Sequence, residues 1–212
     1  MALDKIICFG KNYADHCNEI GDPKVEAPVI FLKPASCLTQ ARNWIEPLQI
    51  SRLSSTDLLN DLHYECEIIL QLREGGYKMS IEDAENSIGH YSIGLDMTLR
   101  KLQRQLKDQG HPWTTAKVFP NSAIIGPWVE CQYQELEQIQ FGLKLNGEIK
   151  QNSSVSNMIF NPAKLVQYAS QFFELCSGDI IFTGTPAGVG ALVSPAKIEL
   201  LMDTKSLAVD FL

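Results

Sequence analysis

The chain has 212 residues, of which 45% are hydrophobic and 20% charged, and its formal net charge is -7 at pH 7. This composition is typical of a globular protein and excludes collagen-like and disordered chains. The negative charge, in a chain without a long run of Lys or Arg, argues against a nucleic-acid partner. We expect residues 1–212 to form a single domain, because this length can enclose one core and no linker or internal repeat interrupts it.

Six cysteines are scattered along the chain without a Cys-x-x-Cys pair, which predicts reduced thiols in a cytoplasmic protein. The first residues lack a basic segment followed by a long apolar run, and nowhere do about 18 apolar residues follow one another. We therefore expect neither an export signal nor a membrane partner.

The N-terminal segment alternates short apolar runs with polar stretches. Residues Lys5–Phe9 and Val29–Leu32 are predicted to be buried strands, and the polar stretch between them is compatible with a short helix that ends near Gly21. Residues 34–61 contain Pro47 and a Ser/Thr cluster but no regular period, which predicts connecting structure.

A period of two begins at Leu62 and lasts to Leu72, with apolar residues at alternate positions from Tyr64 onward. Glu65 and Glu67 fall on the opposite face, because successive side chains of a strand point to opposite sides. This alternation predicts one strand with an apolar face and a carboxylate face.

Asp96 lies where a predicted strand gives way to a predicted helix. Tyr91–Leu95 is the strand, and from Thr98 onward leucines recur at helical spacing until Gly110 interrupts the pattern. The same position would also suit an N-cap residue.

The C-terminal half contains a hairpin, a helix and two further strands. Asn146-Gly147 tolerates positive φ, which predicts a tight turn between strands at Phe141–Leu145 and Glu148–Gln151. Asn161-Pro162 opens a helix that is expected to end before Gly178. The two further strands are Asp179–Phe182 and Ile198–Met202. Strands outnumber helices without a regular βαβ alternation, which predicts an α+β fold with a dominant mixed or antiparallel sheet.

Glu65 and Glu67 form a candidate metal site that needs a third ligand from elsewhere in the chain, and Asp96 is one candidate. Carboxylates at alternate positions of a strand share a face, and oxygen ligands favour Mg²⁺, Mn²⁺ or Ca²⁺. The alternatives are a solvated acidic face on an edge strand for the Glu pair and a helix cap for Asp96.

Two cations follow this acidic cluster in the sequence. Arg100 lies one helical turn beyond Asp96, and Lys117 follows the loop at Trp113, so both can stand beside the carboxylates and bind a substrate carboxylate. The alternatives are a helix-surface ion pair for Arg100 and a solvated loop position for Lys117.

His16 and Glu19 have the spacing of neighbours on one helical face, so Glu19 can orient the imidazole. A positioned His–carboxylate pair can activate water, although a surface pair without function has the same spacing. Thr183–Gly190 follows a strand, and its glycines let backbone N–H groups approach a ligand closely. The alternative for this segment is a tight turn between two strands, since it lacks the Gly-Lys-Ser/Thr of a P-loop.

Several segments of distinctive sequence follow one another over most of the chain. They are Gly10–His16, Pro28–Pro34, His63–Glu67, Gly94–Thr98, Trp113–Lys117, Ser156–Phe160 and Gly178–Pro186. In this order they resemble the fumarylacetoacetate hydrolase family, in particular its small acylpyruvase-like members. An ordered set of this kind is more specific than any single motif.

The resemblance implies roles for the residues considered above. The metal ligands would be Glu65, Glu67 and Asp96, and the substrate contacts would be Arg100, Lys117 and Thr185. His16 and Glu19 would lie on a lid over the site and act with Lys117 as catalytic residues. The implied fold is a mixed β-sandwich roll that is usually dimeric, so we expect a homodimer.

The family suggests an Mg²⁺-dependent hydrolase, with Mn²⁺ or Ca²⁺ as other metals, that cleaves small 2-oxo acids. Its substrates would be acylpyruvates such as acetylpyruvate or fumarylpyruvate, and its products pyruvate and a carboxylic acid. Alternatives with similar chemistry are an oxaloacetate tautomerase or decarboxylase and a 2-hydroxy-dienoate isomerase; an inactive metal-binding relative is more remote. The chain departs from the family pattern in Ala41–Asp61 and Leu192–Leu212, which concern the pocket rim and the dimer surface.

Overall fold

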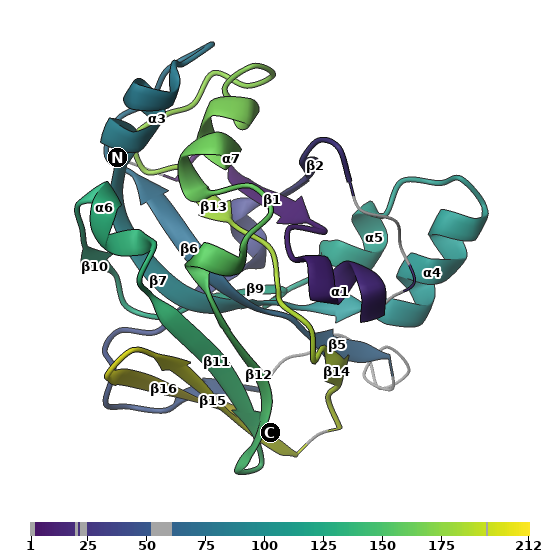
Figure 1. The fold of residues 1–212 in the computed structure, drawn as a ribbon. Helices are drawn as coiled ribbons and strands as arrows, with labels where there is room; N and C mark the ends of the chain where they lie inside the picture. The colour runs from purple at the N-terminus through teal and green to yellow at the C-terminus, as the bar shows by residue number, and fades with distance from the viewer. Residues whose placement is uncertain (1–2, 20, 22–24, 52–60, 194) are drawn as a thin grey trace.

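The computed structural model describes residues 3–19, 21, 25–51, 61–193 and 195–212 (Figure 1). Its largest sheet consists of β1 (Ile6–Gly10), β2 (Val29–Lys33), β3 (Leu38–Gln40), β6 (Cys66–Leu72), β7 (Ile88–Asp96), β9 (Ala123–Ile125), β10 (Val129–Glu130) and β13 (Ile180–Phe182). The strand order is β2-β1-β13-β6-β7-β9-β3, and β10 pairs with β7.

A second sheet has the order β12-β11-β15-β16-β4. Its strands are β4 (Leu48–Ile50), β11 (Gln140–Leu145), β12 (Glu148–Ser154), β15 (Ala196–Met202) and β16 (Lys205–Phe211). The short strands β5 (Leu62–Tyr64), β8 (Thr98–Leu99) and β14 (Gly190–Ala191) form a third sheet. Parallel and antiparallel pairs occur together, which confirms the predicted α+β fold with a strand-rich, mixed β-sandwich roll.

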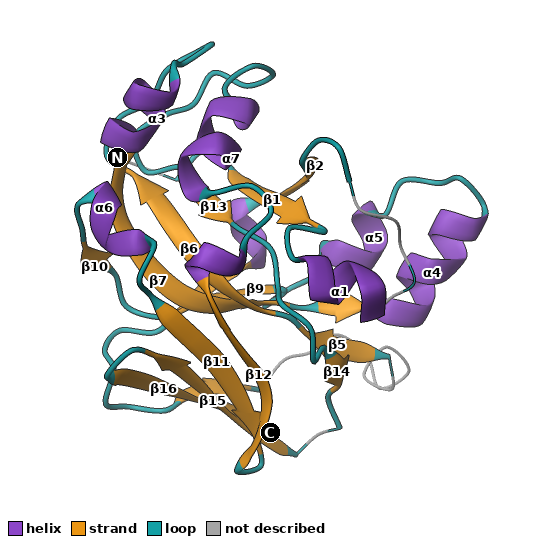
Figure 2. Cartoon of the chain, in the orientation of Figure 1, coloured by secondary structure: helices purple, strands orange, loops and turns teal. Residues whose placement is uncertain are grey.

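The helices lie at the margins of the strand layers (Figure 2). They are α1 (Ala14–Glu19), α3 (Ile81–Ser87), α4 (Arg100–Asp108), α5 (Thr114–Lys117), α6 (Tyr133–Leu136) and α7 (Pro162–Ala169), with short 3-10 turns at Ala35–Cys37 and Val155–Asn157. In Figure 2, α3 and α7 lie at one end of the sheets, whereas α1, α4 and α5 gather at the right of the view. Within the described residues, no helix is long and apolar enough to cross a membrane.

The central position of β6 explains its composition. It pairs with β13 on one side and β7 on the other, and six of its seven residues are buried. The edge-strand alternative for the Glu pair is therefore wrong. The predicted strand Leu62–Leu72 is interrupted at Glu65, because β5 pairs in the three-stranded sheet and β6 in the eight-stranded one.

The predicted hairpin and C-terminal helix are present. Asn146 and Gly147 have φ values of 51° and 88° and connect β11 with β12. The Asn161 side chain accepts a hydrogen bond from the Lys164 N–H at 2.9 Å and caps α7, with Pro162 in the first turn. The regular helix ends at Ala169, earlier than the apolar pattern suggested, and Phe172 beyond it is exposed.

The prediction that residues 34–61 are only connecting structure is wrong for two short strands. β3 pairs in parallel with β9, and β4 pairs in parallel with β16. Their partners lie far along the chain, so each strand depends on long-range pairing and has too few residues to display a period of its own. Residues 52–60 lie outside the described part of the chain.

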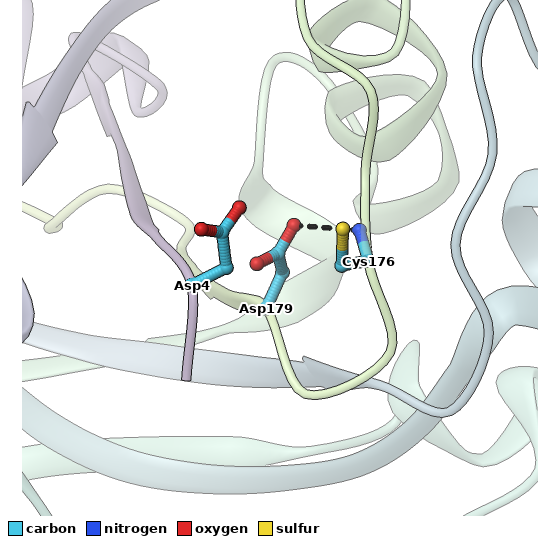
Figure 3. Close-up of side chains that lie close together, drawn as sticks. All are labelled: Asp4, Cys176 and Asp179. Atoms are coloured by element: carbon cyan, nitrogen blue, oxygen red, sulfur yellow. Dashed lines mark hydrogen bonds between the residues drawn. The ribbon is translucent and has the colours of Figure 1, made fainter. Parts of the chain in front are cut away.

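A buried carboxylate holds the turn that precedes β13, next to Asp4 and Cys176 (Figure 3). Asp179 accepts hydrogen bonds from the Cys176 N–H at 2.8 Å, the Lys5 N–H at 3.2 Å and the Lys5 ammonium at 2.8 Å. Asp4, Cys176 and Asp179 are residue types that can bind a metal ion. The Lys5 ammonium already pairs with both carboxylates, so their charge needs no metal ion. We therefore interpret it as a structural clamp that ties the N-terminal strand to β13.

Replacing Asp179 with Asn should lower the free energy of unfolding by about 1.5–3 kcal/mol, because a buried anion that accepts several hydrogen bonds is lost. Urea unfolding followed by circular dichroism measures the change. Asp4→Asn is the matched control, since that side chain is 62% exposed, and it should leave the unfolding midpoint nearly unchanged. Equal effects of the two substitutions would contradict the clamp.

Candidate metal centre and active site

Three buried carboxylates from adjacent strand ends converge on one point. Glu67 lies on β6, Asp96 ends β7, and Glu65 occupies the junction of β5 and β6. Each offers one oxygen, and these oxygens lie within 4.8 Å of one another. Glu65 is 6% exposed, whereas Glu67 and Asp96 are each 1% exposed. An acidic cluster of this kind, shielded from water, requires cations.

The capping alternative for Asp96 is wrong. The N-cap of α4 is Leu99, and the first N–H groups of the helix are bound by a different carboxylate. Asp61 accepts from the Lys101 N–H at 2.7 Å and from the Leu102 N–H at 3.1 Å. Asp96 therefore remains available to the cluster.

Arg100 and Lys117, which the sequence placed near the cluster, both contact it directly. The Arg100 guanidinium pairs with Glu65 through Nη2 and donates to Gln103 through Nη1 at 2.8 Å. The Lys117 ammonium donates to Glu65 at 2.8 Å, to Asp96 at 2.8 Å and to the Thr98 hydroxyl at 2.6 Å. The surface alternatives for these two cations are wrong, since Lys117 is buried and both pair with metal-ligand candidates.

A third cation, Lys33 at the end of β2, was missed as a site residue in the sequence. Its Nζ lies 2.9 Å from Asp96 Oδ1, and it donates to the backbone carbonyl oxygens of Lys117 and of Ser122, the latter at 3.0 Å. The only sequence signal was its presence in the Pro28–Pro34 segment, because a Lys that ends an apolar strand is ordinarily solvated.

The charges around the cluster shift its ionisation in opposite directions. Burial alone would raise the pKa of Glu65, but the positive charges of Lys117 and Arg100 outweigh it and hold this pKa far below its usual value. Burial would lower the pKa of Lys117, and the carboxylates of Asp96 and Glu65 instead raise it. Burial raises the pKa of Glu67 well above its usual value, and repulsion from Asp96 and Glu65 adds to this effect. The negative charge of Glu67 is thus less well compensated by nearby cations than that of Glu65.

Among the described residues, two buried polar atoms of the site have no hydrogen-bond partner: Asp96 Oδ1 and Arg100 Nε. The Lys33 ammonium is close to Asp96 Oδ1, but its direction does not satisfy hydrogen-bond geometry. Buried atoms without partners are rare and often mark a ligand or an ion. The all-oxygen cluster fits Mg²⁺, Mn²⁺ or Ca²⁺, and the guanidinium N–H of Arg100 without a partner fits a substrate carboxylate.

The His16–Glu19 pair lies on α1, beside the cluster. His16 Nδ1 is 3.2 Å from Glu19 Oε2, and His16 is buried. The backbone N–H of Gly188 donates to the same Glu19 carboxylate, at 3.0 Å to Oε1 and 3.2 Å to Oε2. The glycine-containing segment after β13 therefore holds α1 in place over the site.

Replacing Gly188 with Ala should loosen this contact. Gly188 has φ +97°, and an added Cβ would lie 1.9 Å from the Lys150 carbonyl oxygen, so the backbone must move away from Glu19. We expect kcat/KM to fall by about tenfold, as for an about 1.4 kcal/mol loss, with little change in metal affinity. Gly110→Ala is the control, because Gly110 also has positive φ but open space around it. Equal activity losses in both variants would contradict the contact.

Thr185, for which the family resemblance implies a substrate contact, lines the site. Its hydroxyl donates to the Cys66 carbonyl oxygen at 2.8 Å and accepts from Gln151 Nε2 at 2.8 Å. The Gln151 carboxamide also accepts from the Cys66 N–H at 2.9 Å and donates to the Pro186 carbonyl oxygen at 2.9 Å. Gln151 thus holds Cys66, the residue between Glu65 and Glu67, in place. This role could not be predicted from a polar residue in a hairpin strand.

A small cavity of about 30 Å³ unites these groups. Its lining includes His16, Glu65, Glu67, Asp96, Arg100, Lys117 and Thr185, together with Phe31, Gln103, Lys107 and Trp113. Glu19 stands behind His16 and does not line the cavity. The residues that the sequence singled out therefore occupy one place in the fold.

The chain is a member of the fumarylacetoacetate hydrolase family. The family model described as "Fumarylacetoacetate (FAA) hydrolase C-terminal" matches residues 5–209. The chain is 33% identical over 207 residues to oxaloacetate tautomerase YcgM of Escherichia coli, with 97% of this chain and 91% of that protein covered. It is 34% identical to a mitochondrial oxaloacetate tautomerase of Rattus norvegicus, with 93% of this chain and 86% of that protein covered.

A similar solved structure is that of fumarylpyruvate hydrolase from Pseudomonas aeruginosa in complex with Mn²⁺ and pyruvate. The TM-score is 0.92 at 35% identity, and the match covers 99% of this chain and 90% of that one. Family membership defines an enzyme of the fumarylacetoacetate hydrolase type, and the buried acidic triad is its candidate site for a divalent metal.

Proposed function

We propose that this protein is an oxaloacetate tautomerase that uses Mg²⁺ or Mn²⁺ held by Glu65, Glu67 and Asp96. The observation that carries the proposal is one cavity lined by the acidic triad and by Arg100, whose Nε has no hydrogen-bond partner among the described residues and can bind a substrate carboxylate. When bound, the ion would supply a Lewis acid for the carboxylate and 2-oxo oxygen of the substrate. The names of the Escherichia coli and Rattus norvegicus relatives support the same reaction.

The chain's own residues suit the proton transfers of keto–enol exchange. Arg100 Nε would donate a hydrogen bond to a substrate carboxylate, and this contact would orient the substrate in the cavity. His16, oriented by Glu19, would remove the proton from carbon 3. Lys117 would stabilise the negative charge that develops on the 2-oxo oxygen and return a proton there.

The charge balance supports a substrate with two carboxylates. Glu65, Glu67 and Asp96 carry three formal negative charges, and Lys33, Arg100 and Lys117 carry three formal positive ones. Lys11 and Lys107 also line the cavity, so a divalent ion would leave an excess of at least two positive charges, which favours a dianion over a monoanion. Oxaloacetate and fumarylpyruvate are dianions, whereas acetylpyruvate is a monoanion.

Hydrolysis of acylpyruvates is the second candidate, because the His16–Glu19 pair at 3.2 Å is also suited to water activation. In this reaction water attacks the distal carbonyl carbon, the bond between carbons 3 and 4 breaks, and the pyruvate fragment takes up a proton at carbon 3. The Mn²⁺ and pyruvate in the related fumarylpyruvate hydrolase support this alternative.

A substrate panel separates the two candidates. Metal-free protein is assayed with and without Mg²⁺ or Mn²⁺ on keto and enol oxaloacetate, fumarylpyruvate and acetylpyruvate. Absorbance reports tautomerisation, and coupled assays report pyruvate and carbon dioxide, which also detects decarboxylation. We expect metal-dependent keto–enol exchange to give the highest kcat/KM. A higher kcat/KM on fumarylpyruvate would favour the hydrolase, and no metal-dependent turnover would indicate an inactive relative.

A further inference from the structure

Lys33 is a cation enclosed in a ring of oxygen atoms. It is 1% exposed, and its ammonium donates to the carbonyl oxygens of Lys117, Ser122 at 3.0 Å and Met97 at 3.5 Å. Asp96 Oδ1 lies 2.9 Å from the same nitrogen. The ammonium therefore joins the end of β2 to the end of β7, to α5 and to the residue before β9.

The two lysines at Asp96 differ in what else they bind. Lys33 contacts one oxygen of the Asp96 carboxylate, and its other partners are backbone carbonyl oxygens. Lys117 contacts the other oxygen, and its other partners are the side chains of Glu65 and Thr98. Backbone partners stay fixed when a ligand enters, whereas carboxylate partners are the groups for which a metal ion competes. Lys33 is thus the permanent neighbour of Asp96 and Lys117 the exchangeable one.

We propose that Lys33 is a positioning residue that holds Asp96 and the backbone of Lys117 in the arrangement needed for metal binding. The proposal rests on the metal site of the proposed function. One ammonium organises both a ligand and the lysine that faces the substrate, so its loss disturbs two parts of the site together. Groups that orient metal ligands commonly change metal affinity by about 10–100-fold when they are removed.

The sign of the effect distinguishes positioning from charge alone. A buried positive charge next to Asp96 repels a divalent cation, so if Lys33 acted only through its charge, its removal would tighten metal binding. If Lys33 positions Asp96 and Lys117, its removal weakens metal binding although a repulsive charge is gone. The two roles therefore predict opposite changes in the same quantity.

The experiment is a titration of metal-free full-length protein with Mn²⁺, followed by electron paramagnetic resonance, for the wild type and Lys33→Met. We expect the Kd for Mn²⁺ to rise by about 10–100-fold in the variant. Lys5→Met is the matched control, because Lys5 also pairs with a buried carboxylate, Asp179, which belongs to a separate group from the acidic triad and does not line the cavity. Circular dichroism verifies that each protein is folded, and the control should keep the wild-type Kd.

Lys33→Arg keeps the positive charge and provides the second variant where Lys33→Met does not fold. The planar guanidinium cannot reproduce the compact ring of contacts that an ammonium makes, so Mn²⁺ binding should again weaken. A Kd within twofold of the wild type in Lys33→Arg, or a lower Kd in Lys33→Met, would overturn the proposal. If the wild type itself does not bind Mn²⁺, the proposed function fails, which is distinguishable from failure of Lys33 alone.

Discussion

Replacing Glu67 with Gln is expected to reduce the affinity for Mn²⁺ by more than about 100-fold and to abolish turnover. Loss of a direct ligand should exceed the about 10–100-fold effect that is typical when only a partner of a ligand is removed. Gln keeps the shape of the side chain and can still accept the hydrogen bond from the Gly184 N–H, which is 2.8 Å from Glu67 Oε2. The change therefore removes charge from the cluster and leaves its geometry in place.

The same substitution should stabilise the metal-free protein. Glu67 is buried beside two other carboxylates, and burial with repulsion from Asp96 and Glu65 already raises its pKa, so a neutral side chain suits this position better. Thermal unfolding with and without Mn²⁺ measures both effects. The wild type should gain Tm with added Mn²⁺, because an ion that binds only the folded state stabilises it, and the variant should gain almost none.

Glu148→Gln is the control for the Glu67 experiment, because Glu148 lies exposed on the β11–β12 hairpin, away from the cavity. It should retain the wild-type affinity for Mn²⁺. Full Mn²⁺ affinity and full turnover in Glu67→Gln would show that the three-carboxylate site is wrong.

Replacing His16 with Ala should lower kcat by about 10²–10⁴-fold, the range typical of general acid–base catalysis, with little change in Mn²⁺ affinity. His16 lines the cavity and contacts Glu19, but it belongs to none of the strands that carry the three carboxylates. Steady-state rates on oxaloacetate and fumarylpyruvate, measured with saturating Mn²⁺, test this expectation.

Two comparisons make the His16 result specific. His111→Ala is the control, because His111 is exposed beyond the end of α4 and should be without effect. A loss on oxaloacetate alone would assign His16 to proton transfer at carbon 3, whereas a loss on fumarylpyruvate alone would assign it to water. Unchanged rates on both substrates would eliminate the catalytic role of His16.

The carboxylates were predictable because their geometry is local. Alternation along a strand placed Glu65 and Glu67 on one face, and this holds although the strand changes sheets at Glu65. The convergence of Asp96 with them depends on the antiparallel pairing of β6 with β7, in which Glu67 faces Gly94. No local pattern reports that pairing, so the third ligand required the resemblance to a family.

Lys33 and Gln151 could not be predicted because their partners come from distant segments. The Lys33 ammonium binds carbonyl oxygens that are brought together only when β2, α5 and β9 pack around it. The sequence shows Gln151 only as a polar residue in a hairpin strand. Its partners Thr185 and Pro186 lie in the loop after β13, more than 30 residues further along the chain. The strands β3 and β4 were missed for the same reason, since both depend on partners from the later part of the chain.

The change of sheet at Glu65 has a mechanical consequence. Glu67 and Asp96 belong to the eight-stranded sheet, whereas Glu65 lies between β5 of the small sheet and β6 of the large one, and its carbonyl oxygen accepts a hydrogen bond from the Asp96 N–H at 2.9 Å. An ion bound by all three carboxylates would therefore connect the eight-stranded sheet to the junction with the small sheet. A movement of the small sheet relative to the large one would shift Glu65 relative to Glu67 and Asp96. Metal binding and a rigid junction between the two sheets would therefore depend on each other.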